Sequence, residues 1–261
     1  MAKRKRSTLG GELRFLALLA LGVLLFRSFV LTPFYIPSES MLPRLLIGDY
    51  LVVEKWAYGY SRWSLPWGWP LIPGRIFGDT PARGDVVVFR SPEPESHDVI
   101  KRVIGLPGDT IQMRRGQLIL NGRPVPKLRI ADFTLPESPN YACPDQFEIV
   151  VGGERLCRFQ RYRETLPGGR SYDVLDLAAG TDGDNTSLFT VPAGHVFLMG
   201  DNRDNSADSR FAPPVGMGYV PLERVQGRAG VSVFSTDGSA AWLKPWTWFS
   251  AARPERIGEG F

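Results

Sequence analysis

Cysteine and histidine are scarce in this sequence. Its 261 residues include only two cysteines, Cys143 and Cys157, and two histidines, His97 and His195. These four side chains could together ligate one metal ion, but no CxxC or HxxxH pair is present to anchor such a site. We therefore predict no metal site. In an oxidising compartment we expect the two cysteines to form a disulfide, and two free thiols are the alternative.

The common motifs of hydrolases and nucleotide-binding enzymes are missing as well. The sequence contains no GxSxG, no Ser-x-x-Lys, no HEXXH and no P-loop. These motifs are typical of α/β-hydrolases, of penicillin-binding enzymes, of zinc metalloproteases and of P-loop nucleotide-binding proteins, respectively. A Ser-His-Asp triad would have only His97 or His195 as its base. What remains for nucleophilic catalysis is a serine whose base is a lysine brought close by folding. Such a lysine must be neutral, and burial favours the neutral form.

An excess of positive charge is absent outside the N-terminal tail. The net charge is +4, and the tail alone holds four cations, Lys3, Arg4, Lys5 and Arg6. The remainder has 27 basic and 27 acidic residues. A nucleic-acid-binding protein carries its excess charge on the folded part. We therefore predict that nucleic acid is not a partner.

Only one apolar run is long enough to cross a bilayer, residues 13–31. A helix of this length spans about 28 Å, close to the hydrocarbon thickness. The basic tail, residues 1–12, precedes the run, so the positive-inside rule predicts a cytoplasmic N-terminus and an exported region, residues 32–261. A cleavable signal peptide is the rival interpretation. Because RSFVLTPFYIP contains no small-x-small cleavage site, we predict an uncleaved, single-pass anchor.

Beyond this run no long amphipathic helix stands out, and the pattern predicts a mainly β fold. Short β-branched runs are separated by glycine and proline. The sequence RRG predicts a hairpin loop and Asn121-Gly122 a tight turn. Residues from about 124 to 190 are less regular, hold both cysteines and predict an inserted smaller subdomain. The predicted strands are residues 50–55, 84–90, 99–105, 110–113, 117–120, 195–200 and 229–235.

The seven tryptophans lie in two short windows. The first window, residues 55–77, holds Trp56, Trp63, Trp67 and Trp69. The second window, residues 240–249, holds Trp242, Trp246 and Trp248. Core packing is one interpretation. Because the first window is rich in proline and glycine, and because tryptophan prefers the membrane interface, we expect at least that window to contact the outer leaflet.

Two stretches contain the candidate nucleophile and base. In IPSESM, residues 36–41, Ser38 and Ser40 point the same way if the chain stays extended. Two hydroxyls on one face could act as nucleophile and oxyanion donor, although serines that make local turn bonds at a membrane exit fit the hexapeptide too. In VIKRVI, Lys101 lies on one strand face with Val99 and Val103. This setting favours a lowered pKa, whereas a lysine that snorkels outward is the alternative.

A third stretch, GDNRDNSADSR at residues 200–210, is dense in polar side chains. A solvated loop with Asx turns is one interpretation, and calcium ligation by Asp201, Asp204 and Asp208 is another. The stretch lacks the spacing and terminal glutamate of an EF-hand, and its two arginines would oppose a cation. An ion pair between Asp208 and Arg210 would form easily across one residue.

Together these stretches resemble the nucleophile, base and loop motifs of the bacterial type I signal peptidases. IPSESMLPRLLIGDYLVVEK, RGDVVVF, IKRVIGLPGD and GDNRDNSADSR occur in the order of that family, directly after an anchor. ETLPGGRSYDVLD and DGSAAWLKPWTWF are similar to stretches of its Gram-negative members. The resemblance implies an antiparallel β catalytic core with an inserted smaller β-rich subdomain. Three departures are Glu39 in place of glycine, Arg44 in place of threonine, and one membrane span where some Gram-negative members have two.

The resemblance also implies roles for seven residues. Ser40 is then the nucleophile and Lys101 the general base, while the oxyanion site combines the Ser38 hydroxyl with the Ser40 backbone N–H. The implied supporting residues are Ser206, which orients Lys101, the ion pair Asp208–Arg210, and Asp201, which holds the loop.

The expected activity is removal of N-terminal signal peptides from exported precursors after small-x-small motifs, without cofactor or metal. The expected location is the inner membrane, with the catalytic region in the periplasm and with membrane lipid as a further partner. Two alternatives remain. One is a dedicated Ser-Lys maturation protease with a single target, of the conjugation-pilus type, and the other is a non-catalytic membrane-anchored periplasmic scaffold.

Overall fold

The structure is a computed structural model that describes residues 9–92, 97–241 and 243–261. The basic side chains of the tail and Trp242 lie outside these residues.

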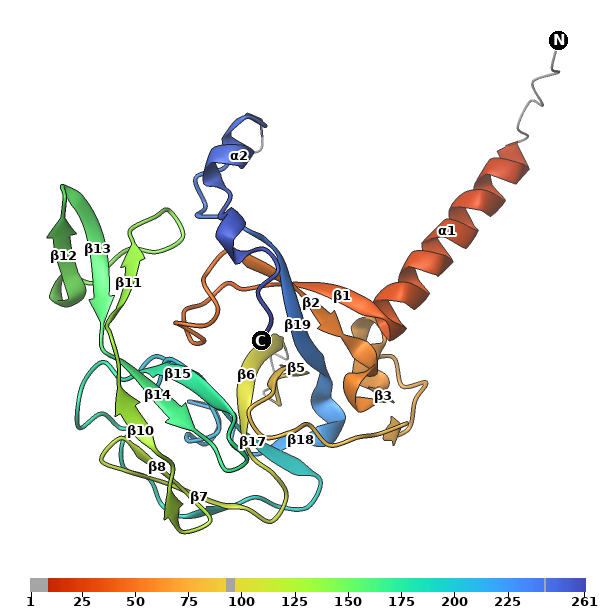
Figure 1. Cartoon of the computed structure of the whole chain (residues 1–261). Helices are drawn as coiled ribbons and strands as arrows, with labels where there is room; N and C mark the ends of the chain where they lie inside the picture. The colour runs from red at the N-terminus through yellow and green to blue at the C-terminus, as the bar shows by residue number, and fades with distance from the viewer. Residues whose placement is uncertain (1–8, 93–96, 242) are drawn as a thin grey trace.

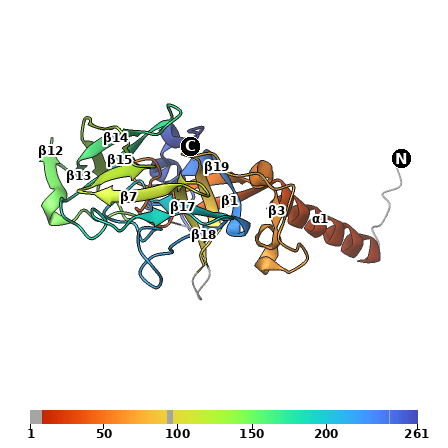
Figure 2. The same cartoon turned by 90° about the horizontal axis from the view of Figure 1, so that it is seen from below.

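The first element, α1 (Leu9–Phe29), is an α-helix that projects away from the body (Figures 1 and 2). It starts at Leu9 rather than at residue 13, because a helix can continue past the end of an apolar run. It ends before Leu31, which belongs to the first strand. Within α1 only Ser28 is buried, and α1 is long and apolar enough to cross a membrane.

A curled seven-stranded sheet forms the centre of the body. Its order is β1-β2-β19-β5-β6-β17-β18, and every neighbouring pair is antiparallel. The strands at 50–55, 84–90, 99–105, 195–200 and 229–235 are thereby confirmed to within a few residues. β1 and β18, the two edge strands, were not predicted from the sequence. The strands are β1 (Leu31–Tyr35), β2 (Asp49–Glu54), β5 (Val86–Arg90), β6 (Asp98–Gly105), β17 (His195–Met199), β18 (Val220–Pro221) and β19 (Val225–Ser235).

A second, four-stranded sheet has the order β16-β7-β8-β9. Both predicted turns are confirmed there. Arg115 and Gly116 have φ values of 49° and 71°, and Asn121 and Gly122 have φ values of 53° and 75°. This left-handed geometry is the one that two-residue hairpin turns require, and asparagine and glycine tolerate it best. The strands are β7 (Thr110–Arg114), β8 (Gln117–Leu120), β9 (Arg123–Pro124) and β16 (Phe189–Thr190).

Two three-stranded sheets follow, β10-β14-β15 and β11-β13-β12. The second contains Cys157, which forms the predicted disulfide with Cys143. The β11–β13 sheet stands away from the seven-stranded sheet in Figure 1, whereas Tyr172 and Val174 on β15 pack with Phe197 of β17 in one core cluster. The division of the chain near residues 124 and 190 stays a prediction. The strands are β10 (Lys127–Arg129), β11 (Phe133–Pro136), β12 (Glu148–Val151), β13 (Glu154–Phe159), β14 (Arg161–Thr165) and β15 (Ser171–Leu175).

Short elements complete the described chain. One small hairpin, with its 3-10 turns, carries the first tryptophan window, and a five-residue helix carries part of the second. In Figure 1 this helix, α2, projects from the same side of the body as α1. The elements are η1 (Lys55–Tyr58), β3 (Tyr60–Ser61), η2 (Arg62–Ser64), η3 (Pro66–Gly68), β4 (Arg75–Ile76), η4 (Asp145–Phe147), η5 (Leu222–Arg224), α2 (Thr247–Ala251) and η6 (Pro254–Arg256).

The C-terminal segment braces the loop between β1 and β2. Asp49, at the start of β2, is fully buried, and its carboxylate accepts hydrogen bonds from the Leu46 backbone N–H at 2.9 Å and from Arg256 Nη2 at 2.6 Å. Arg256 Nη2 also donates to the backbone oxygen of Arg44 at 2.8 Å. Arg44 itself donates to Gly260 and stacks over Phe261. The arginine that departs from the family pattern therefore ties this loop to the end of the chain.

Replacing Arg256 with methionine should lower the free energy of unfolding by about 3–5 kcal/mol, because the buried Asp49 carboxylate loses its closest cation. The control is Arg228→Met, which removes an arginine from a largely exposed pair with Glu54 and should cost less than about 1 kcal/mol. Urea denaturation of the full chain in detergent micelles measures both. Equal, small effects of the two variants would contradict this account.

Candidate active site

The loop between β1 and β2 carries Ser38 and Ser40. Ile36 and Met41 on either side are 1% and 0% exposed and pack into the core cluster of β2, β5 and β6. The backbone between these two anchors is therefore held in place. The chain bends at Ser38 and turns from Ser40 onward, so the extended form considered in the sequence analysis is not adopted. The two hydroxyls nevertheless lie on the same side, with 3.4 Å between the Oγ atoms.

Lys101 lies on β6, between β5 and β17 in the sheet. Its Nζ donates a hydrogen bond of 2.6 Å to Ser40 Oγ, and its side chain is 4% exposed. Val99 and Val103 pack into one core cluster, as the predicted alternation of β6 requires. Folding thus brings together two residues that are 61 positions apart.

Burial controls the protonation of Lys101. Removal of the ammonium from water lowers the pKa of Lys101 from 10.5 to about 8. The negative charges of Asp208 and Asp201 oppose this change, and the positive charge of Arg210 adds to it. A pKa near 8 leaves a useful fraction of neutral amine near neutral pH, which a lysine base needs.

The loop at residues 200–210 follows β17 and contains the expected ion pair. Arg210 donates to both carboxylate oxygens of Asp208 at 2.9 Å, and both side chains are buried. Asp208 also accepts a hydrogen bond of 2.9 Å from the Gly200 backbone N–H. Burial alone would raise the pKa of Asp208, but the Arg210 guanidinium and the backbone N–H groups outweigh it, so this pKa lies below its usual value.

Ser206 is buried in the same loop, next to the main chain of Ser40. A Cβ atom added to Gly200 would lie 2.3 Å from Ser206 Oγ and 2.5 Å from the Ser40 backbone oxygen, so only glycine fits between them. Ser206 Oγ has no hydrogen-bond partner among the residues that the structure describes. The hydrogen bond to Lys101 implied by the family resemblance is therefore not formed here, because Nζ is directed to Ser40. A role of Ser206 in orienting Lys101 stays a prediction.

Sequence reasoning missed most of the buried ion pairs that hold this loop. Asp201 was expected to hold the loop, but its partner was not foreseen: Arg102 donates to it at 2.7 and 2.5 Å. Arg203 donates to Glu164 at 2.8 and 2.6 Å, and Tyr172 donates to the same carboxylate at 2.8 Å. A charged residue inside a strand pattern, as Arg102 is in VIKRVI, signals a buried partner but does not identify it.

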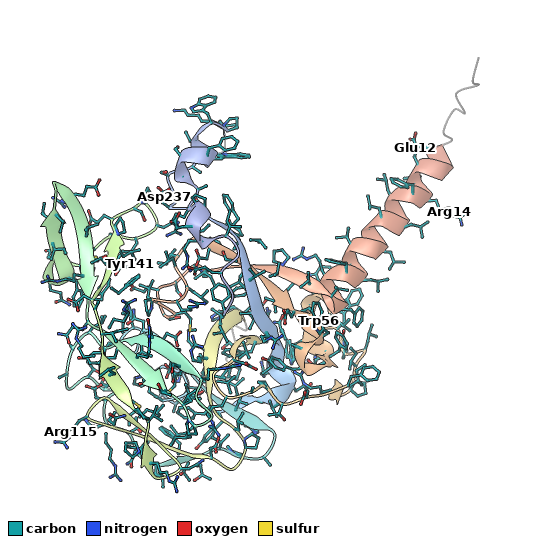
Figure 3. The ribbon with its side chains drawn as sticks, viewed as in Figure 1. Glu12, Arg14, Trp56, Arg115, Tyr141 and Asp237 are labelled. Atoms are coloured by element: carbon teal, nitrogen blue, oxygen red, sulfur yellow. A yellow bond between two sulfur atoms is a disulfide. The ribbon has the colours of Figure 1, made fainter. Side chains whose placement is uncertain are left out.

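Glu39 connects the nucleophile loop to two other segments. Its carboxylate accepts hydrogen bonds from Asn205 and from the hydroxyl of Tyr141, whose pKa is raised by burial and by the Glu39 charge. The Ser40 backbone oxygen accepts from the Asn202 N–H at 3.1 Å. Figure 3 places Tyr141 near the base of the β11–β13 sheet. Glu39, in place of the glycine of many family members, therefore links the site to the disulfide-bonded segment.

A cleft opens beside the two serines. It has a volume of about 420 Å³ and is lined by the nucleophile loop, by Asn205 and by the segment from Asn140 to Ala142. A peptide that reached Ser40 through this cleft would pass Ser38 and Tyr141.

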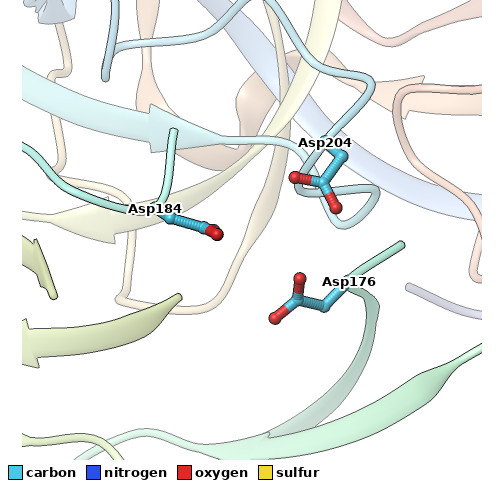
Figure 4. Close-up of side chains that lie close together, drawn as sticks. All are labelled: Asp176, Asp184 and Asp204. Carbon is cyan, nitrogen blue, oxygen red and sulfur yellow. The ribbon is translucent and has the colours of Figure 1, made fainter. Parts of the chain in front are cut away.

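Calcium ligation by the 200–210 loop does not fit the geometry. Asp201 and Asp208 are bound by arginines, which leaves only Asp204 of the proposed set. Asp204 does gather with Asp176 and Asp184 (Figure 4). However, Lys127 binds Asp176, backbone N–H groups of residues 177 and 178 donate to Asp204, and those of residues 180 and 181 donate to Asp184. These acids already have partners.

The metal site that the two cysteines and two histidines might have formed is excluded by the disulfide.

Comparison with known proteins agrees with the resemblance. Residues 11–234 match the family described as signal peptidase, peptidase S26. Signal peptidase I of Rickettsia typhi is 36% identical over 221 residues, which cover 82% of this chain and 75% of the relative. For signal peptidase I of Rickettsia canadensis the identity is 38% over the same coverage.

A solved structure of a signal peptidase I from Enterococcus faecalis V583 is 25% identical and covers 57% of this chain and 97% of its own. Its TM-score of 0.31 is too low to support an argument about the fold. The family match and the relatives are sufficient: the chain belongs to the signal peptidase family of peptidases, S26. Family membership supports a peptidase that removes signal peptides.

In a pH titration of the full chain in detergent micelles, the lysine side chains should fall into two groups with different pKa values. We expect two ¹³Cε signals to titrate near pH 8, because burial lowers the pKa of both Lys101 and Lys55 to about 8. ¹³C-lysine labelling with NMR measures this, and Lys101→Arg and Lys55→Arg each remove one signal and so assign it. A signal lost in Lys101→Arg that titrates near 10.5 would refute the lowered pKa.

Proposed function

We propose that this chain is a membrane-bound endopeptidase that removes N-terminal signal peptides from exported precursors after small-x-small motifs, with Ser40 as nucleophile and Lys101 as general base. The observation that carries the proposal is the 2.6 Å hydrogen bond between the buried Nζ of Lys101 and Ser40 Oγ. A non-catalytic scaffold would need neither this contact nor the burial of a lysine. Removing an ammonium from water is costly, and such lysines are typical of functional sites.

The reaction has two halves. Neutral Lys101 takes the proton of Ser40 Oγ while that oxygen attacks the scissile carbonyl, and it then gives the proton to the leaving amine. In the second half Lys101 takes a proton from water as the water oxygen bonds to the acyl carbon, and it returns this proton to Ser40 Oγ as the bond between Oγ and the acyl carbon breaks. The Ser38 hydroxyl and the Ser40 backbone N–H are proposed to stabilise the oxyanion. Ser38 Oγ lies 3.4 Å from Ser40 Oγ, so its hydroxyl could reach the oxyanion of a carbonyl that Ser40 attacks.

We place the substrate along the edge of the seven-stranded sheet. β1 is an edge strand, it contains Pro33, and it leads directly into the nucleophile loop. Proline in a strand is typical of edges, where an extended peptide can be added by main-chain hydrogen bonds. A cleavage segment bound there would enter the cleft at Ser38 and Ser40 with small side chains directed into the body.

The proposed location is the inner membrane, with α1 as a single span, the basic tail in the cytoplasm and the catalytic region in the periplasm. A structural disulfide, Cys143–Cys157, supports an oxidising compartment for the catalytic region. We propose that both tryptophan windows contact the outer leaflet. In the first window Trp67 and Phe77 are 82% and 85% exposed, and in the second Phe249 is 87% exposed.

Depletion of this protein in its host, with complementation by Ser40→Ala, should cause many uncleaved precursors to accumulate. Loss of the nucleophile lowers the rate at least about a thousandfold. The measurement is mass spectrometry of N-termini across the exported proteins, with wild-type complementation as the control. Accumulation of one precursor alone would favour the dedicated maturation protease. Normal processing of all of them would reject the proposal.

Cleavage of a precursor by the wild-type chain should become faster as the pH rises through about 8 and then level off, because the neutral amine of Lys101 is the active form. Lys101→Arg should be inactive at every pH, since arginine does not deprotonate in proteins. The matched control is Lys244→Arg, which keeps the positive charge at an exposed position near the C-terminus and should retain the wild-type profile. Activity of Lys101→Arg comparable with the wild type would sink the lysine-base mechanism.

A further inference from the structure

A second buried lysine lies at the foot of α1, away from the catalytic loop. Lys55 follows β2 and is 2% exposed, and its Nζ donates one hydrogen bond, of 3.2 Å, to Gln226 Oε1. An ammonium has three N–H donors, so it is only partly satisfied by this bond. The mechanism proposed above makes no use of Lys55. A buried lysine of this kind calls for another explanation.

Lys55 lines a cavity of about 400 Å³ that lies where α1, β1 and the first tryptophan window meet. The apolar part of its lining includes Leu24 of α1, Trp63 and Trp67. The polar part includes Lys55, Arg27, Ser28, Ser64 and Gln226. Figure 1 shows β3 and its loops directly beneath the base of α1, and Figure 3 places Trp56 there.

The charges that line this cavity are mostly positive. Arg27, Lys55 and Arg90 are the cations, and Asp98 is the acid, which pairs with Arg90 at 3.1 Å and accepts a bond from Gln226. Burial, together with the charges of Arg75 and Arg27, lowers the pKa of Lys55 to about 8 against the opposing charge of Asp98. A bound anion would reverse this effect and hold Lys55 in its charged form.

α1 ends at Phe29, and Arg27 and Ser28 belong to its last turn. With α1 spanning the bilayer as proposed above, this turn and the cavity beside it would lie at the depth of the lipid headgroups. Tryptophan is enriched at this level of a bilayer, and arginine near a helix end reaches toward it. Leu24 lines the cavity, and the other leucines of α1 are exposed. These apolar side chains suit an acyl chain, whereas a free inorganic anion would leave them in contact with water.

We propose that this cavity binds the headgroup of an anionic glycerophospholipid of the outer leaflet. Its phosphate would accept charge-assisted hydrogen bonds from Lys55 and Arg27, its glycerol hydroxyls would face Ser28 and Ser64, and its acyl chains would run along Leu24 and Trp67. The bound lipid then joins the anchor to β2, whose other end adjoins the nucleophile loop. This inference is independent of the proposed peptidase reaction.

The test uses the full chain in a zwitterionic detergent, titrated with phosphatidylglycerol and followed by native mass spectrometry. We expect one saturable lipid. Lys55→Met and Arg27→Gln should each weaken its binding about tenfold, the effect of losing one hydrogen bond to a charged group. The matched control is Arg123→Gln, which removes the same charge as Arg27→Gln from an exposed position on β9 and should bind like the wild type.

The remaining outcomes decide against the proposal. Equal binding by the wild type, Lys55→Met and Arg27→Gln would overturn it, and so would equal affinity for phosphatidylcholine with the same acyl chains. Displacement of the lipid by millimolar inorganic phosphate would show a site for a free anion instead. Arg27 is exposed on α1, so its variant folds and keeps the test decisive even if Lys55→Met is unstable. Thermal unfolding of each variant checks this point.

Discussion

The hydrogen bond between Lys101 Nζ and Ser40 Oγ is the contact on which the surrounding structure depends. It requires a lysine that has lost its water, and burial on β6 supplies this condition. Two acids nearby, Asp201 and Asp208, would on their own hold Lys101 in its charged form. Each is bound by an arginine, Arg102 or Arg210. The ion pairs therefore limit the negative charge that Lys101 meets, in addition to holding the loop.

The need to hold Ser40 beside Lys101 explains why several segments contact the short nucleophile loop and its neighbour, the 200–210 loop. Ile36 and Met41 fix the nucleophile loop to the core, and the Asn202 N–H binds the Ser40 backbone oxygen. Arg203 ties the 200–210 loop to Glu164 on β14, where both charges are buried. Removing one partner of such a pair leaves an uncompensated charge and costs several kcal/mol. Small displacements of the loop are therefore opposed, which keeps a 2.6 Å contact in place.

A second lysine with a lowered pKa shows that burial alone does not define a catalytic base. Burial lowers the pKa of both Lys55 and Lys101 to about 8, and both are almost fully buried. Only Lys101 faces a serine hydroxyl, whereas Lys55 faces Gln226 and a cavity beside the membrane helix. The chemical role of each lysine follows from its neighbours. The proposed lipid binding at Lys55, which follows β2, and the proposed peptide chemistry at Lys101, on β6, would thus both use a buried amine.

The order of short β-branched runs, the single apolar span and the turn at Asn121-Gly122 were determined by local sequence, because each depends on backbone preference or on side-chain periodicity. Ser40 and Lys101 could be identified because their motifs resemble those of a family. The partners of Arg102 and Arg203, the bend at Ser38 and the link from Glu39 to Tyr141 were decided only by the tertiary structure. These contacts join residues far apart in the chain, and their energy exists only when both partners are buried together.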